Sequence, residues 1–128
     1  MLKAAAILFG IVFLIVGALG FAPAVTTQMN GMPMLLGIFH INTAHNIVHL
    51  ASGAVFLLCG LASTGAARAF FRIFGLVYAV VAVLGFLKGD GLLLGVISNN
   101  MPDVWLHMVL AAIMLLLGFA VPADRANA

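Results

Sequence analysis

Three of the four histidines fall in one short stretch, HINTAHNIVHL, at positions 40–50. His45 and His49 are four residues apart, and the fourth histidine, His107, follows Asp103 at the same interval. Residues spaced by four lie on one face of a helix. Imidazole nitrogens and carboxylate oxygens bind Zn²⁺ and also suit Cu or Fe. The spacing therefore predicts a metal site made of His45, His49, Asp103 and His107.

A purely structural role is an equally simple interpretation of these residues. Asn42 and Asn100 are placed to act as N-caps, which satisfy the free amide groups at the start of a helix. His45 and Asp103 then fall three residues into their helices and would complete the caps. The remaining histidine of each pair would hydrogen-bond its counterpart or a carbonyl, as polar residues do between membrane helices. The cluster would then be a polar brace.

A third interpretation takes His49 and His107 as the two axial ligands of a haem in an electron-transfer protein. His40 lies outside the expected helix, and we expect it to be at most an accessory to the site. The sequence leaves the structural brace, the Zn or Cu site and the haem site open.

The composition indicates that the histidines and Asp103 belong to a membrane protein. Of the 128 residues 66% are hydrophobic and 6% are charged, which no soluble domain of this size could tolerate at its surface. A helix crosses the hydrocarbon layer in about 20 residues, and four apolar runs of that kind are present. They predict an all-α, four-helix transmembrane bundle in a single membrane domain, 1–128, with spans at about 4–21, 43–62, 70–87 and 101–121.

The chain contains an internal repeat. LLGIFHINTAHNIVHL at 35–50 matches LLGVISNNMPDVWLHM at 93–108, an offset of 58 residues. The first and third spans match as well, at an offset of 65. We therefore expect two tandem helical hairpins, about 4–62 and 70–121. Because each contains two spans, the hairpins must be parallel and related by a pseudo-twofold axis along the membrane normal.

The basic residues predict the orientation of the bundle. Lys3, Arg68, Arg72 and Arg125 fall on one side of the expected topology and Lys88 on the other. Positive charge is enriched in cytoplasmic segments. Both termini are therefore expected in the cytoplasm, with the His/Asp cluster near the outward face.

Two outward loops carry short apolar segments, 34–39 and 92–97, that are too short to span. We expect each segment to lie along the interface or to dip back into the membrane. The first loop also contains Met29, Met32 and Met34, whose thioethers suit Cu(I) and could be accessory ligands.

Several classes of function are disfavoured. A net charge of +2 is too small and dispersed for a nucleic-acid partner. No nucleophile triad, phosphate-binding loop or pair of catalytic carboxylates can be built, so an enzyme is not expected. The expected partners are the lipid bilayer and either further copies of the chain or a larger membrane assembly, in which the protein would be a structural subunit.

The motif pair INTAHNIVHL and NNMPDVWLHM, with LLGIF before it and GALGF closing the first span, resembles a family of small four-span bacterial membrane proteins catalogued as a domain of unknown function. The resemblance covers nearly the whole chain. It implies an all-helical four-span fold in the bacterial inner membrane, but no substrate, cofactor or catalytic residue. Its H-N-x-x-H and D-x-x-L-H signatures would be His45, Asn46 and His49, and Asp103, Leu106 and His107.

Overall fold

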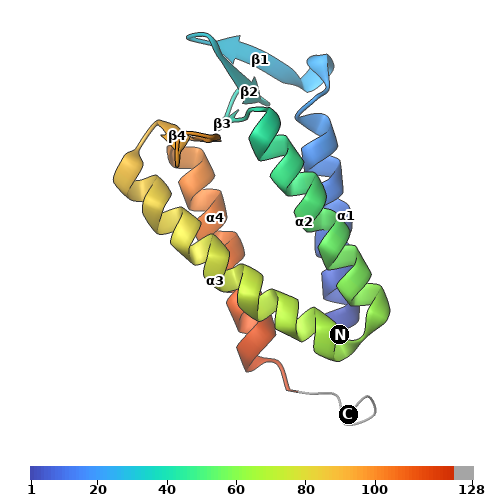
Figure 1. Ribbon diagram of the computed structural model, residues 1–128. Helices are drawn as coiled ribbons and strands as arrows, with labels where there is room; N and C mark the ends of the chain where they lie inside the picture. The colour runs from blue at the N-terminus through green and yellow to red at the C-terminus, as the bar shows by residue number, and fades with distance from the viewer. Residues whose placement is uncertain (123–128) are drawn as a thin grey trace.

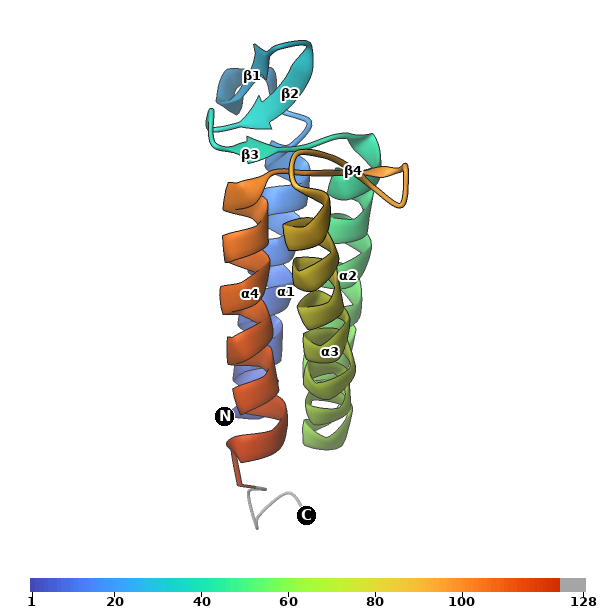
Figure 2. The same cartoon turned by 90° about the vertical axis from the view of Figure 1, so that its left-hand side faces the viewer.

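Residues 1–122 are described in the computed structural model, and most of them form four long helices packed side by side (Figures 1 and 2). All four are long and apolar enough to cross a membrane. The prediction of a four-helix membrane bundle is therefore confirmed. The helices are α1 (Leu2–Leu19), α2 (Thr43–Ala62), α3 (Thr64–Lys88) and α4 (Met101–Leu115), which continues into a π-helical turn, η2 (Leu116–Ala120).

The helix α3 extends beyond the expected span 70–87 at both ends and begins directly after α2. Ser63 separates the two helices, and its side-chain oxygen accepts the N–H of Ala66 at 3.0 Å. This N-cap satisfies an amide that the start of a helix leaves free. Thr64 and Gly65 thus belong to the first turn of α3.

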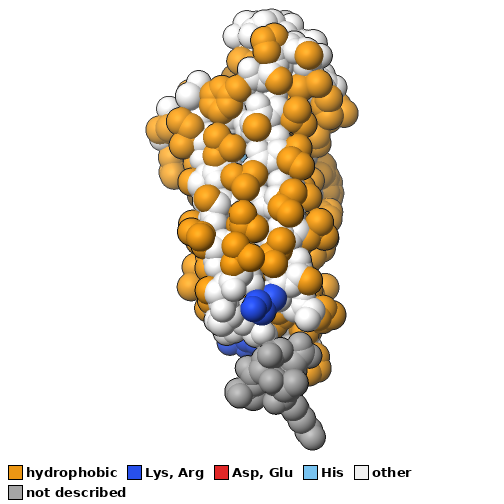
Figure 3. All heavy atoms as spheres, turned by 90° about the vertical axis from the view of Figure 1, so that its right-hand side faces the viewer, with side chains coloured by type: hydrophobic (Ala, Val, Ile, Leu, Met, Phe, Trp, Pro, Cys, Tyr) orange, Lys and Arg blue, Asp and Glu red, His pale blue; other side chains and the backbone are white. Residues whose placement is uncertain are grey.

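We call the end where α1 begins and η2 ends the terminal end, and the opposite end the loop end. Arg68 and Arg72 anchor the terminal end, donating at 2.8 Å to the carbonyls of Val121 and Gly118 respectively. On the face shown in Figure 3, hydrophobic side chains cover the helices and basic side chains gather near this end. The distribution matches the expected charge bias, although Arg125 lies outside the described residues.

The loop end is built from short strands that the sequence analysis did not expect. The segments 34–39 and 92–97 take part in these strands, and their place relative to the membrane interface stays a prediction. Each folds into part of an antiparallel sheet, which satisfies its backbone groups within the loop. The elements are η1 (Pro23–Val25), β1 (Thr26–Met29), β2 (Met32–Leu35) and β3 (Phe39–His40) in the first loop, and β4 (Gly91–Leu93) and β5 (Ile97–Asn99) in the second.

The same tight turn occurs in both loops. Leu36 and Gly37 have φ of 54° and 67°, and their counterparts Leu94 and Gly95 have φ of 52° and 71°. A leucine in this left-handed region is strained, whereas glycine adopts it freely. The repeated Leu-Gly dipeptide therefore sets the same backbone path in both halves of the chain.

Aromatic rings fill the centre of the bundle. Phe56 and Phe71 are fully buried, with ring centroids 5.3 Å apart. Phe13 packs on Phe56 at 5.6 Å and on Tyr78 at 5.8 Å. These four rings come from α1, α2 and α3, so the core joins the two hairpins along the bundle axis.

Glycines close the contact between α1 and α2. A Cβ on Gly53 would lie 2.8 Å from the backbone nitrogen of Leu14, and one on Gly10 would lie 2.8 Å from that of Leu57. Real side chains do not approach backbone this closely. Only residues without a Cβ allow the two helices to pack at this distance, as in other membrane helix pairs.

Replacing Gly53 by Val should therefore destabilise the bundle. The new side chain would push α1 away from α2, and overpacking of this kind costs about 1–3 kcal/mol. The measurement is unfolding by denaturing detergent in mixed micelles. Ala54→Val is the matched control, because Ala54 is the exposed neighbour on the same helix. Equal stability of Gly53→Val and the control would contradict the close packing.

Candidate metal site

The two helices that carry the histidines begin with the same cap. Asn42 Oδ1 accepts the N–H of His45 at 2.8 Å, and Asn100 Oδ1 accepts that of Asp103 at 3.0 Å. At the start of α4 the Asp103 carboxylate also accepts the Asn100 N–H at 3.1 Å, forming a capping box. Each asparagine thus fixes the first turn of a helix and the direction of the side chains that follow it.

The same two asparagines tie the loops together. Asn42 Nδ2 donates to the carbonyl of Val96 at 2.7 Å, and Asn100 Nδ2 donates to that of Ile38 at 2.9 Å. Both the donors and the acceptors differ by 58 positions, so each bond is the counterpart of the other. This reciprocal pair holds the starts of α2 and α4 next to each other.

Three histidines meet below these caps. One ring nitrogen from each of His45, His49 and His107 lies within 4.8 Å of the others. All three side chains are buried, with exposed fractions of 5–7%. The centroid of the His45 ring is 4.9 Å from that of His49 and 6.1 Å from that of His107. The structure thus brings His107 next to His45 and His49, which lie 62 and 58 positions earlier in the chain.

The hydrogen bonds of His45 leave one of its ring nitrogens free to bind. Its Nδ1 lies 3.1 Å from the carbonyl oxygen of His40, which can only accept, so Nδ1 carries the hydrogen. The hydroxyl of Ser98 donates to the same carbonyl at 3.1 Å. Nε2 of the neutral ring then carries a lone pair. Within the described residues Nε2 has no hydrogen-bond partner.

The other two rings also have an unsatisfied nitrogen. Nδ1 of His49 and Nδ1 of His107 are buried without a hydrogen-bond partner among residues 1–122. A buried polar atom normally has a partner, because leaving water without one costs a few kcal/mol. Three such atoms in one cluster are therefore a feature that calls for a ligand.

Aromatic rings pack symmetrically against the cluster. Phe13 stacks on His49 and Tyr78 packs edge-on against His107, each with ring centroids 5.1 Å apart. Phe13 and Tyr78 are counterparts in the repeat, as are the two histidines. The alignment of the spans contained this signal, but the sequence analysis did not use it, and it also missed Ser98.

Asp103 is not among the residues whose ligand atoms converge. Its carboxylate is engaged in the capping box instead, so three of the four predicted ligands converge in this structure. The reason is geometric, since an N-cap contact holds the carboxylate back toward the helix start. His40 is also outside the set, with its Nδ1 3.2 Å from the carbonyl oxygen of Asn99.

The methionines lie in the β1–β2 hairpin and not in the cluster. Met29 and Met32 are paired across the two strands, and Met29 is 50% exposed. Met34 is buried and pairs with Thr27. These methionines lie in strands at the loop end, whereas the histidines lie within the bundle. The accessory role of the methionines stays a prediction.

The fold and the cluster define a small multi-pass membrane protein with a buried tri-histidine site. A family model described as Domain of unknown function (DUF4383) matches residues 3–120, and the chain belongs to this family. No curated protein and no solved structure matches the chain.

The two functions of Asn42 can be separated by mutation. Asn42→Ser should keep the cap but lose the bond to Val96, at a cost of about 0.5–1.5 kcal/mol. Asn42→Ala should lose the cap as well, adding about 0.5–2 kcal/mol. The free energy of unfolding in mixed micelles measures both, with the exposed Gln28→Ala as control. Equal losses of stability in Asn42→Ser and Asn42→Ala would show that the cap contributes nothing to the free energy of unfolding.

Proposed function

We propose that the protein binds a transition-metal ion through His45, His49 and His107. The observation that carries the proposal is the convergence of one ring nitrogen from each of three buried histidines, each of which also has a buried ring nitrogen without a hydrogen-bond partner among the described residues. A metal ion would satisfy all three nitrogens at once.

The spacing of the nitrogens suits a metal. Zn–N bonds are about 2.0–2.1 Å long, so two nitrogens on one tetrahedral ion are about 3.3 Å apart. The three nitrogens already lie within 4.8 Å of one another. Small rotations of the rings would bring them to bonding distance, with no change in the helices.

The environment of His45 supports the same conclusion. Metal-bound histidines usually donate their second ring nitrogen to a carbonyl or carboxylate, which fixes the ring and makes the ligand more basic. The bond from His45 Nδ1 to the His40 carbonyl has this form. Ser98 orients that carbonyl from the other repeat.

Zinc and copper are the preferred candidates. Three imidazoles suit Zn²⁺ and Cu, and they leave one coordination position for a water or an external ligand. With both termini in the cytoplasm of a bacterial inner membrane, as the charge bias favours, this position would open near the outer face. Further copies of the chain or other membrane subunits remain proposed partners.

A structural brace is less favoured. A brace would use the ring nitrogens in hydrogen bonds between the helices, whereas His49 Nδ1 and His107 Nδ1 have no such partner in the part of the chain that the structure describes. The connection between the repeats is instead made by Asn42 and Asn100.

A haem is less favoured because of the packing around its two expected axial ligands. A macrocycle needs an open slot between them. The rings of Phe13 and Tyr78 pack directly on His49 and His107, and His45 lies against both histidines. This arrangement fits a single ion better than a planar cofactor.

Protein purified without a nickel column and stripped with chelator should take up about one zinc or copper ion per chain. The measurement is elemental analysis after titration with the metal alone and removal of excess. His45→Ala, His49→Ala and His107→Ala should each weaken binding at least about tenfold, because each removes one ligand of the same ion. At 100 times its Kd the ion should stabilise the protein by about 2.7 kcal/mol.

His40→Ala is the matched control, since it removes a neighbouring histidine that is outside the cluster. Asp103→Asn tests the fourth predicted ligand and should leave the stoichiometry unchanged. Loss of metal in only one of the three cluster variants, or an equal loss in His40→Ala, would refute shared coordination. An iron content accompanied by a Soret band would favour the haem instead.

Ser98→Ala should weaken metal binding without removing a ligand. Loss of its hydroxyl frees the His40 carbonyl that holds the His45 ring, and changes of this kind cost about 10–100-fold in metal affinity. Titration of the stripped protein measures the effect. Ser63→Ala, which removes a cap between α2 and α3, should leave the affinity unaltered. Equal affinities for Ser98→Ala and the unmodified protein would contradict the orienting role.

A further inference from the structure

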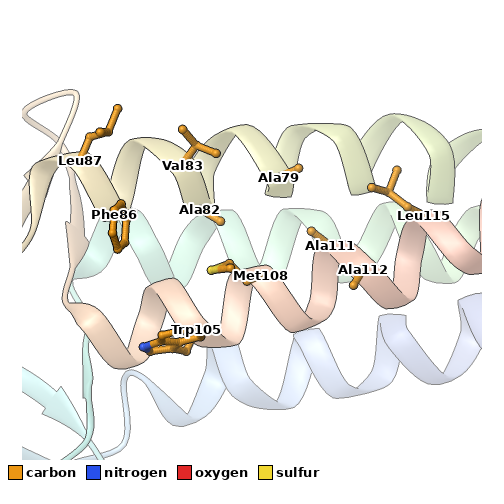
Figure 4. Close-up of a pocket in the computed structure, with 10 residues that line it drawn as sticks. All are labelled: Ala79, Ala82, Val83, Phe86, Leu87, Trp105, Met108, Ala111, Ala112 and Leu115. Carbon is orange, nitrogen blue, oxygen red and sulfur yellow. The ribbon is translucent and has the colours of Figure 1, made fainter.

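An apolar groove of about 520 Å³ lies between α3 and α4, on the surface of the spanning region. Its sides include Ala79 and Ala82 from α3 and Ala111 and Ala112 from α4 (Figure 4). Trp105 marks the end of the groove nearer the loops. The volume is typical of a small-molecule pocket, about 300–1,000 Å³, yet almost all of the lining is hydrocarbon.

The corresponding place on the first hairpin is closed. Gly17 packs against Leu50, and a Cβ on Gly17 would lie 2.9 Å from its Cγ. Gly53 packs against Leu14, and a Cβ there would lie 2.8 Å from the Leu14 nitrogen and 2.9 Å from its Cγ. The first hairpin therefore has neither the separation nor the space for a groove.

Three sequence differences open the groove in the second hairpin. The counterparts of Gly17 and Gly53 are Ala82 and Ala111, at the repeat offsets of 65 and 58. Their methyl groups prevent α3 and α4 from approaching as closely as α1 and α2. The counterpart of Leu14 is Ala79, so the side chain that would fill the remaining space is absent.

We propose that this groove holds one acyl chain of an anionic phospholipid. The groove lies between two helices, is lined by alanines on both and consists almost entirely of hydrocarbon, so its lining matches an alkyl chain. A single alkyl chain is narrow enough. The groove faces the hydrocarbon layer, where lipid chains are present at high concentration.

Lys88 provides the charge that selects the headgroup. A smaller hollow of about 310 Å³ is lined by Leu87, Lys88 and Leu94 among others, and it shares Leu87 with the groove. Lys88 is exposed at the loop end of α3, where its ammonium group can reach the level of the phosphates. Asp90 is also exposed, but within the described residues it forms no ion pair with Lys88.

Trp105 is the only tryptophan and lines the groove, so its fluorescence reports on the bound chain. The test reconstitutes the full-length protein in vesicles of zwitterionic phosphatidylcholine that contain a minor fraction of phosphatidylglycerol. In one set of vesicles only the phosphatidylglycerol carries bromine in the middle of its acyl chains, and in the other set only the phosphatidylcholine does. Bromine quenches tryptophan fluorescence on contact. We expect brominated phosphatidylglycerol to be enriched about fivefold at Trp105, the effect of one basic side chain near a membrane surface.

Two variants test the two parts of the site. Lys88→Gln should abolish the preference for phosphatidylglycerol, whereas Lys3→Gln at the terminal end should not. Ala79→Leu restores the side chain of the first repeat and should fill the groove, so quenching should fall. Val80→Leu changes the exposed neighbour outside the groove and should leave quenching unaltered.

Equal quenching by the two lipids at their bulk fractions would overturn the proposal, because it would show only bulk bilayer around Trp105. Quenching that falls as the protein-to-lipid ratio rises, together with a cross-linked dimer through the groove, would assign the surface to a second copy instead. These readouts do not depend on metal binding.

Discussion

The reciprocal hydrogen bonds of Asn42 and Asn100 are the contact on which the rest of the site depends. Each amide caps its own helix with its oxygen and binds the opposite loop with its nitrogen. His40 and Ser98 add hydrogen bonds between the same two loops, so directional contacts hold the starts of α2 and α4 together, whereas apolar packing is weakly directional in a membrane. The histidines lie within the next two turns, so their spacing follows from the position of the caps.

The pseudo-twofold axis expected from the repeat would place equivalent residues of the two hairpins on opposite sides of that axis. His49 and His107 are such a pair, and Phe13 and Tyr78 support them with the same ring separation. His45 breaks the symmetry, because its counterpart is Asp103. One member of this second pair joins the cluster and the other closes a capping box. The result is three converging histidines, and under the proposed function this arrangement would suit an ion that also binds water or an external ligand.

The two hairpins differ most where they face the lipid. Glycines bring α1 and α2 into backbone contact, while alanines at the corresponding places keep α3 and α4 apart and leave a groove. A change of one methyl group at each position is enough, because packed helices have no spare volume to absorb it. The outer surfaces of the two halves can therefore differ without any change in the histidine cluster between them.

The sequence alone determined the membrane-spanning helices, because the length and apolarity of each run leave no alternative in a bilayer. It also determined the pairs His45/His49 and Asp103/His107, since helical spacing is local. The strands of the loop end were missed because their hydrogen bonds depend on the left-handed turns at Leu36 and Leu94, which are unusual for leucine. The tertiary structure decided which side chains converge. Whether Asp103 faces the cluster or its own helix start, and whether a repeat position is closed or open, depends on distances between helices that no single helix contains.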